Sequence, residues 1–348
     1  DIRSKFSSLR MIWSTVGAIL AGLVPTLMIK DTLNTSMYLK VAIIFGILFG
    51  FAAVVTFIGT WEKVKPPVKT KLRDSFSEAS SVFKSRSFKI FIGIYLSGQC
   101  AMDFVSGMAI YYVDDVLGGY DKGYLTMLMG VLLSSQLIGM LIFTPIMTRT
   151  SKRTTILIGA PIRLASTLGL LAFSYAGAPI VPVLLLSAGV GIGNAATLTS
   201  IFAILADMAD IDELITSTRR PGIVSGMATF ARKISAGLSV WFIGILLSLV
   251  GYDAKLAHSG VSQAFTTQRG IAMIFIVIPA ILVVLLLIFG YIFPITNKEF
   301  DIVKKEIGRR RGTDGSIASD DEKRILERVT GFKYEDLWKT SNEHKIRS

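Results

Sequence analysis

The sequence predicts an all-α, polytopic membrane protein with about eight transmembrane helices. Hydrophobic residues make up 51% of the chain and charged residues 18%, an apolar excess that one soluble core of this length could not bury. The apolar residues come in blocks of roughly 20, which is the length that crosses about 30 Å of hydrocarbon. The basic residues gather on alternate loops between these blocks, as the loops of membrane proteins do.

In chain order, the predicted spans cover residues 9–29, 37–60, 89–114, 124–146, 155–175, 180–206, 223–250 and 271–294. One set of loops is rich in Arg and Lys, whereas the opposite loops hold only Lys30, Lys122, Lys255 and Arg269. The positive-inside rule therefore puts both termini in the cytoplasm. This topology and attraction to the lipid bilayer account for the net charge of +12, so we expect no nucleic-acid partner.

The long polar segment 61–88 separates two spans from the six that follow. Pro66 and Pro67 interrupt it early, and Phe76 and Val82 belong to an apolar series at helical spacing that predicts an amphipathic helix on the inner membrane surface. Six helices form one half of a major facilitator transporter, in which a linker joins two such halves. We therefore expect a fragment of the major facilitator fold.

This fragment would comprise the last two helices of the N-terminal bundle (1–60), a cytoplasmic linker (61–88), the C-terminal six-helix bundle (89–295) and a cytoplasmic tail (296–348). The first four helices would then be absent, and a start at Asp1 agrees with this expectation. We expect the tail to be a weakly ordered, solvated appendage with a helix over 320–330, to which a regulatory protein could bind.

Ionisable residues at membrane depth are costly, so each is a functional hypothesis. Arg10, Arg163, Arg232 and Lys233 outnumber the deep carboxylate Asp103. Their counter-charges should therefore lie on a missing helix, in a polar cavity or on an anionic substrate. For Arg232 we expect instead a side chain that reaches the interface or a backbone carbonyl, and for Lys233 a position facing a cavity.

Polar and aromatic side chains add further candidates for substrate binding or coupling. Gln99 lies one turn before Asp103, and Trp13 and Tyr112 could pack on the C–H face of a sugar. The small residues of 187–200 serve helix packing, or with Asn194 a hydrophilic path. The chain shows no Cys/His metal spacing, nucleophile elbow or P-loop. We therefore expect neither an enzyme nor a metal site or cofactor. We expect transport to be coupled to an ion gradient.

The segment ADMADIDELITSTRRPGIVSGMATFARKISAG (206–237) resembles the signature of the glycoside–pentoside–hexuronide:cation symporters, the melibiose permease relatives. The matching residues are Asp207, Asp210, Asp212, Glu213, Arg219, Arg220, Gly222, Phe230 and Lys233. The opening DIRSKFSSLRMIWSTVG, with Arg3 and Arg10, is similar to a cytoplasmic loop and the fifth helix of that family. The tail segment TGFKYEDLW (330–338) is similar to C-termini of bacterial members.

The resemblance implies that a sugar binds midway through a bacterial plasma membrane, with Na⁺ or H⁺ on nearby acids, and that two halves rock to expose it alternately. Arg10 and Lys233 would face the cavity, and Lys233 would approach the cation-site carboxylates. A cytoplasmic gate would join basic and acidic residues, namely Arg3, Arg219 and Arg220 with Asp207, Asp210, Asp212 and Glu213. Exposed pairs of this kind are weak, at about 0–1 kcal/mol, which suits a gate that reopens.

Two departures from the family pattern limit the resemblance. The family's cation-binding acids and its principal sugar-binding acid lie on the helices expected to be absent, and Pro221 replaces an acidic residue of the gate motif. We therefore expect this fragment not to perform coupled transport alone. Two other functions stay open, namely a transporter of a lipid or another non-sugar solute, and a transport-dead sensor or interaction protein that signals through the tail.

Overall fold

The computed structural model describes residues 9, 13–14, 16–17, 20–21, 28, 35–59, 79–119, 123–254, 256 and 262–339. Regular structure in these residues is helical throughout, and seven helices are long and apolar enough to cross a membrane. The all-α polytopic fold is thus confirmed. The first predicted span, 9–29, lies largely outside the described residues, as does the linker up to residue 78.

The seven helices follow the predicted spans from the second onward. They are α2 (Thr35–Gly59), α4 (Arg86–Tyr111), α5 (Tyr124–Arg149), α6 (Lys152–Gly169), α7 (Ile180–Thr216), α8 (Pro221–Leu249) and α10 (Phe265–Ile292). A π-helical turn, η2 (Tyr112–Val116), extends α4, and a 3₁₀ turn, η4 (Leu170–Phe173), extends α6. The ends differ from the predicted ones by a few residues, except at α7.

Helix α7 continues well beyond its predicted end at residue 206. The acidic run 207–213 suggests a polar loop, but Met208, Ile211, Leu214 and Ile215 alternate with the acids and are buried. These apolar residues recur at helical spacing and pack in the core, and the acidic residues between them are buried too, so the segment stays helical. The four acidic residues therefore stand on a rigid helix and not in a loop.

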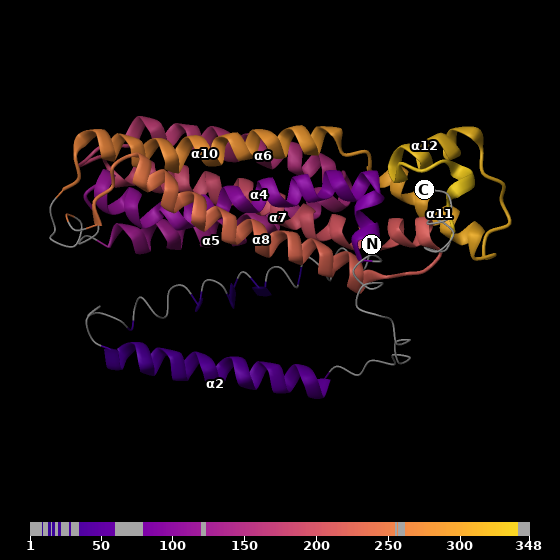
Figure 1. The fold of residues 1–348 in the computed structure, drawn as a ribbon, viewed down its shortest axis with the longest axis horizontal. Coiled ribbons are helices and arrows are strands. Elements are labelled where there is room, and N and C mark those ends of the chain that lie inside the picture. The colour runs from indigo at the N-terminus through magenta and orange to yellow at the C-terminus, as the bar shows by residue number, and fades with distance from the viewer. Residues whose placement is uncertain are drawn as a thin grey trace.

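Helices α4 to α10 form one bundle, in which α7 packs against both α5 and α6 while α4 lies between α10 and α8 (Figure 1). Small residues allow the close approach of α7: a Cβ at Gly193 would lie 2.6 Å from the carbonyl oxygen of Gly159 on α6. The glycines of 187–200 therefore serve packing. Helix α2 lies apart from the bundle in the same view, with almost all its side chains exposed.

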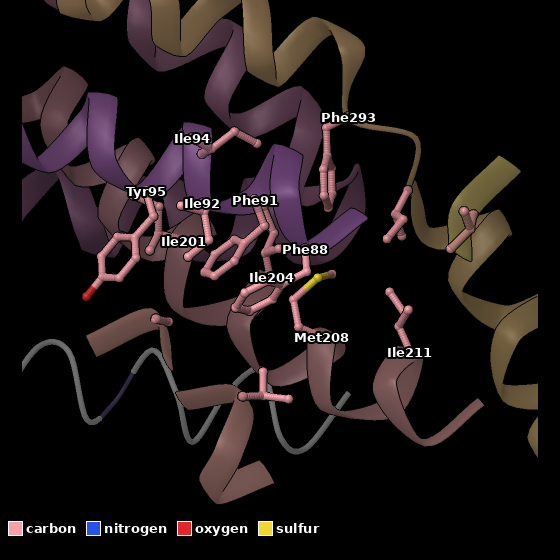
Figure 2. Packing of buried hydrophobic residues seen from close by; sticks show 14 of the residues in the cluster. Phe88, Phe91, Ile92, Ile94, Tyr95, Ile201, Ile204, Met208, Ile211 and Phe293 are labelled. Atoms are coloured by element: carbon pink, nitrogen blue, oxygen red, sulfur yellow. The ribbon is translucent and has the colours of Figure 1, made fainter. Parts of the chain in front are cut away.

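One cluster of the apolar core lies where α4 packs against α7 (Figure 2). Phe88, Phe91 and Tyr95 of α4 pack with Ile204 and Met208 of α7, and the rings of Phe91 and Tyr95 are stacked with centroids 5.7 Å apart. Between membrane helices such contacts stabilise the bundle through van der Waals packing. A second cluster, around Tyr112 and Phe275, fills the other half of the bundle.

The tail folds onto the bundle, so the expected weakly ordered, solvated appendage is wrong for residues 297–339. It forms α11 (Asn297–Arg310), α12 (Asp320–Thr330) and the turn η5 (Tyr334–Asp336). Its apolar side chains join the core around Phe88, namely Phe300, Val303, Ile307, Leu326, Val329 and Leu337. A capping box of Ser319 and Glu322 begins α12, where the helix over 320–330 was predicted.

The end of the bundle at which α11 and α12 lie is called the tail end below. The last residues of the predicted linker also pack there. In the short helix η1 (Ser81–Lys84) Val82 is buried, and the ring of Phe83 meets that of Phe88 edge-on at 5.1 Å. The tail end is therefore built from the end of the linker, the helix ends of the bundle and the tail.

Candidate functional site

An ion pair joins α4 and α8 near the middle of both spans. Arg232 Nη2 donates to Asp103 Oδ1 over 2.7 Å, and the side chains are 21% and 23% exposed. The expectation that Arg232 reaches the interface or a carbonyl is wrong, because α4 places a carboxylate within its reach. The other atoms of the pair, Asp103 Oδ2 and Arg232 Nη1, are buried and have no hydrogen-bond partner among the described residues.

Further polar groups line this seam between α4 and α8. The Cys100 thiol and the Ser235 hydroxyl are 2.6 Å apart, one turn from the ion pair. Gln99 is partly exposed and lies four residues before Asp103, hence on the same face of α4. The sequence-predicted residues Gln99 and Asp103 are thus brought together, and the structure adds Cys100, Ser235 and Arg232.

Lys233 points away from the seam because consecutive helical residues are roughly 100° apart around the axis. Its side chain is exposed and has no hydrogen bond or ion pair in the described part of the chain. Gly226, Gly237 and Gly244 lie on the same face of α8, and a Cβ at any of them would find no atom within 4 Å. Lys233 therefore stands on a face of α8 that no described residue covers, beside the Asp103–Arg232 pair.

The aromatic candidate Tyr112 does not join this face. Tyr112 is fully buried, its ring stacks on that of Phe275 with centroids 4.1 Å apart, and its hydroxyl lies 3.0 Å from Ser174 Oγ. Its ring is therefore closed to a ligand in this structure. Trp13 is 68% exposed, and Arg10 and Arg3 lie outside the described residues.

A second polar network lies inside the bundle. Arg163 of α6 is fully buried, and its Nη1 donates to the Gly98 carbonyl over 3.1 Å and to Asn194 Oδ1 over 3.0 Å. Asn194 in turn donates to Gln136 Oε1 over 2.7 Å. Four helices thus share one hydrogen-bonded chain, in which Arg163 Nε and Nη2 have no partner among the described residues. Asn194 is buried in this network and does not line an open path. Gln136 was not predicted from the sequence.

The acidic residues of α7 meet basic residues at the tail end. Arg220 Nε and Nη2 donate to the two oxygens of Asp212 over 2.9 and 2.7 Å, and both side chains are nearly buried. Arg219, which is 40% exposed, lies 3.1 Å from Asp210. The predicted gate residues on α7 and after it are therefore brought together.

Two basic partners of these acids were missed. Lys152, at the start of α6, pairs with Asp207, and Arg311 of the tail donates through Nε to Glu213 Oε1 over 2.8 Å. Glu213 also lies 3.9 Å from Arg219, so it connects the tail with the segment between α7 and α8. Beside it a cleft of about 440 Å³ is lined by residues that include Arg219, Lys304 and Arg311. The basic loop, the tail and the acids of α7 were all visible in the sequence, but these two pairings were not.

The family described as MFS/sugar transport protein matches residues 1–297. The chain belongs to this family. A glucuronide carrier protein homolog of Escherichia coli is 28% identical over 221 residues, which are 62% of this chain and 46% of that protein. A protein of Salmonella typhimurium that is provisionally named a sulfoquinovose importer is 24% identical over 331 residues, which are 94% of this chain and 68% of that protein.

A Synechocystis protein named as an uncharacterised symporter is 21% identical over 268 residues, which are 77% of this chain and 49% of that protein. The chain thus spans about half of the length of two of these relatives. In transporters of this superfamily the substrate site lies near the bilayer midplane. In this MFS/sugar transport family member, Asp103, Arg232 and Lys233 lie near the middle of α4 and α8.

Proposed function

We propose that the protein containing this chain carries a sugar across the membrane together with Na⁺ or H⁺, by alternating access. The observation that supports this most is Lys233, an exposed cation without a partner among the described residues, beside the Asp103–Arg232 pair at mid-span. A charged side chain persists at that depth where it faces water or a ligand. The sugar class is a glycoside, pentoside or hexuronide.

The similar proteins support this proposal. Two of them carry the names of a glucuronide carrier homolog and a sulfoquinovose importer, both of which denote sugar transport, and a third is named a symporter. A symporter uses the gradient of one solute to drive the other. We propose that Lys233 acts as the coupling residue, because an ammonium can alternate between a cargo group and the carboxylates that bind the cation.

The tail end would face the cytoplasm of a bacterial plasma membrane, because the basic loops of the sequence lie at this end. The charged cluster on α7 would then form the inner gate. Arg219, exposed and paired with Asp210, has the weak interaction that an opening gate requires. Arg220 and Asp212, nearly buried, would hold the start of α8 in both states of the gate.

Uptake by membrane vesicles tests the proposal. Vesicles containing the gene product that includes this chain receive an imposed Na⁺ or pH gradient and a labelled sugar, for which glucuronic acid and melibiose are first choices. The proposal predicts accumulation above the external concentration that collapses when an ionophore dissipates the gradient. Gradient-independent uptake would contradict coupling, and no movement of any glycoside, pentoside or hexuronide would contradict sugar transport.

A further inference from the structure

Two arginines lie where three membrane-spanning helices end at the tail end. Arg149 is the last residue of α5, Arg153 lies in the first turn of α6, and Tyr291 lies in the last turn of α10. Arg153 Nη2 donates to the Tyr291 carbonyl over 2.6 Å, and its guanidinium lies 5.5 Å from the centre of the Tyr291 ring. Both contacts hold the guanidinium in place, and neither partner carries a negative charge.

The loop between α5 and α6 is tied to the start of the tail, which adds a third cation. Asn297 Nδ2 of α11 donates to the Thr150 carbonyl over 2.7 Å. Lys298 is the next residue of α11, and its side chain is exposed like that of Arg149. Arg149, Arg153 and Lys298 are called the basic patch below.

The acids near the basic patch do not cancel its charge. Glu299 of α11 pairs with Arg328 over 3.2 Å, and Asp207 of α7 pairs with Lys152. Asp301, one turn further along α11, is exposed and adds one negative charge to the three positive charges of the patch. Three positive charges and one negative charge leave an excess of about two positive charges among the described residues here.

An apolar stripe on α10 leads away from the basic patch. Ile281, Val284 and Ile288 are 52%, 42% and 46% exposed, and Tyr291 continues the series at 70%. Because these residues are spaced by three and four positions, they lie on one face of the helix. Helix α10 packs against α4 and α6 through other residues, so this stripe is an outer surface of the bundle.

We infer that the basic patch binds the phosphate of an anionic phospholipid of the surrounding bilayer, whose acyl chain lies along the stripe on α10. The ends of spans lie at the level of the lipid headgroups, and basic pockets between transmembrane helices bind anionic headgroups. A guanidinium matches a phosphate through two parallel, charge-assisted hydrogen bonds. A zwitterionic phospholipid brings its own ammonium, which the excess positive charge repels. The lipid is a ligand of the outer surface and is separate from any cargo.

Competition between phospholipids tests the inference. A phosphatidylglycerol with a fluorescent acyl chain is bound to the solubilised gene product that includes this chain, and unlabelled compounds displace it. We expect phosphatidylglycerol to displace the probe at concentrations about tenfold lower than phosphatidylcholine with the same acyl chains. Glycerol 3-phosphate, which has the phosphate without the acyl chains, should not displace it. Equal displacement by the two lipids would overturn the inference, and displacement by glycerol 3-phosphate at the concentrations of phosphatidylglycerol would assign the patch to a soluble phosphate instead.

Variants of single arginines locate the site. Arg153→Gln should weaken phosphatidylglycerol binding by about fivefold, and Arg153→Lys should retain most of it. Arg269→Gln is the matched control, because Arg269 also lies over an aromatic ring, 5.0 Å from the centre of Phe265, but at the other end of α10. It removes the same charge and should leave binding unchanged.

Arg149→Gln provides a second variant at an exposed position, so its effect does not depend on the contact between Arg153 and Tyr291. It should also weaken binding by about fivefold, and its melting temperature without lipid should equal that of the unaltered protein. Unchanged binding in both Arg149→Gln and Arg153→Gln would overturn the inference. Equal losses in these two variants and in Arg269→Gln would overturn it as well, because the lipid would then respond only to the net charge.

Discussion

The backbone N–H of Trp338 donates to the carbonyl of Leu214 over 2.9 Å, so the tail closes the last turn of α7. Lys339 N–H makes the same contact with the Ile215 carbonyl over 3.2 Å. The final carbonyls of a helix have no donor within it, and here the tail provides one. The Ser87 hydroxyl donates to the Val329 carbonyl, which ties the tail to α4 as well. The tail is therefore a structural part of the bundle.

Removal of one tail side chain from the core should destabilise the whole bundle. Leu326 is fully buried, and Leu→Ala changes at such sites cost about 2–5 kcal/mol. We expect Leu326→Ala to lower the melting temperature of the solubilised protein. Ile317, which precedes α12 and is 93% exposed, provides the control, because Ile317→Ala should change stability by less than about 0.5 kcal/mol. Equal melting temperatures for both variants would show that the tail does not stabilise the bundle.

The tail should also loosen in acid. The hydrogen bond from Arg309, followed by that from the Ser319 N–H, lowers the pKa of Glu322 from 4.5 to about 2. A lowered pKa in the folded state contributes stability above pH 4.5, and this contribution is lost as the pH falls toward 2. Hydrogen exchange in α12, corrected for its intrinsic pH dependence, should accelerate over this interval. Glu322→Gln should remove this acceleration. The same pH dependence of exchange in α12 with and without Glu322 would contradict the prediction.

The contact between α6 and α7 depends on the absence of a side chain at Gly193. A Cβ there would lie 2.6 Å from both Arg163 Cβ and the Gly159 oxygen, so Gly193→Ala should cost about 1–3 kcal/mol of stability. Gly237→Ala on α8 meets no atom within 4 Å and should be neutral or stabilising by up to about 1 kcal/mol. Thermal unfolding of the two variants in the same detergent makes the comparison. A stable Gly193→Ala protein would mean that the two helices can separate freely.

The two arginines after α7 should differ in their contribution to stability. Arg220→Gln leaves Asp212 buried without its bidentate partner, at a cost of about 3–5 kcal/mol. Arg219 is 40% exposed, so Arg219→Gln should cost no more than about 1 kcal/mol. Thermal unfolding measures both losses of stability. Transport rates of the two variants then show whether the Arg219–Asp210 or the Arg220–Asp212 pair opens during transport. The assignment of gate and anchor would be wrong if Arg219→Gln were the more destabilising change.

The spans could be predicted because hydrocarbon thickness imposes a length that apolar blocks display directly. The pairs of Arg219 and Arg220 with α7 could be predicted as well, since these partners lie within ten residues of one another. The partner of Arg232 could not, because Asp103 is 129 positions away and only the packing of α4 on α8 brings it near. The network of Arg163, Asn194 and Gln136 depends on the same kind of tertiary contact.

The docking of the tail was missed for a different reason. Its composition is polar and charged, which is typical of a solvated segment, yet Phe300, Val303 and Ile307 recur three and four residues apart. This spacing predicts a helix with one buried face. The basic run 309–311 is likewise engaged in ion pairs with Glu306, Glu322 and Glu213. Periodicity was therefore a better guide than composition.

We expect the face of α8 that no described residue covers to border an aqueous path and not lipid. In a Cys100→Ser background, a cysteine at Gly237 tests this with a membrane-impermeant, charged thiol reagent applied to each side in turn. Ile281→Cys is the control for lipid exposure, because Ile281 is 52% exposed and belongs to α10, which lies across the bundle from α8 in Figure 1. We expect Gly237→Cys to be labelled and a transported sugar to slow the labelling, while Ile281→Cys stays unreactive. Unreactive cysteines at both positions would place Lys233 against lipid and rule out an aqueous path along α8.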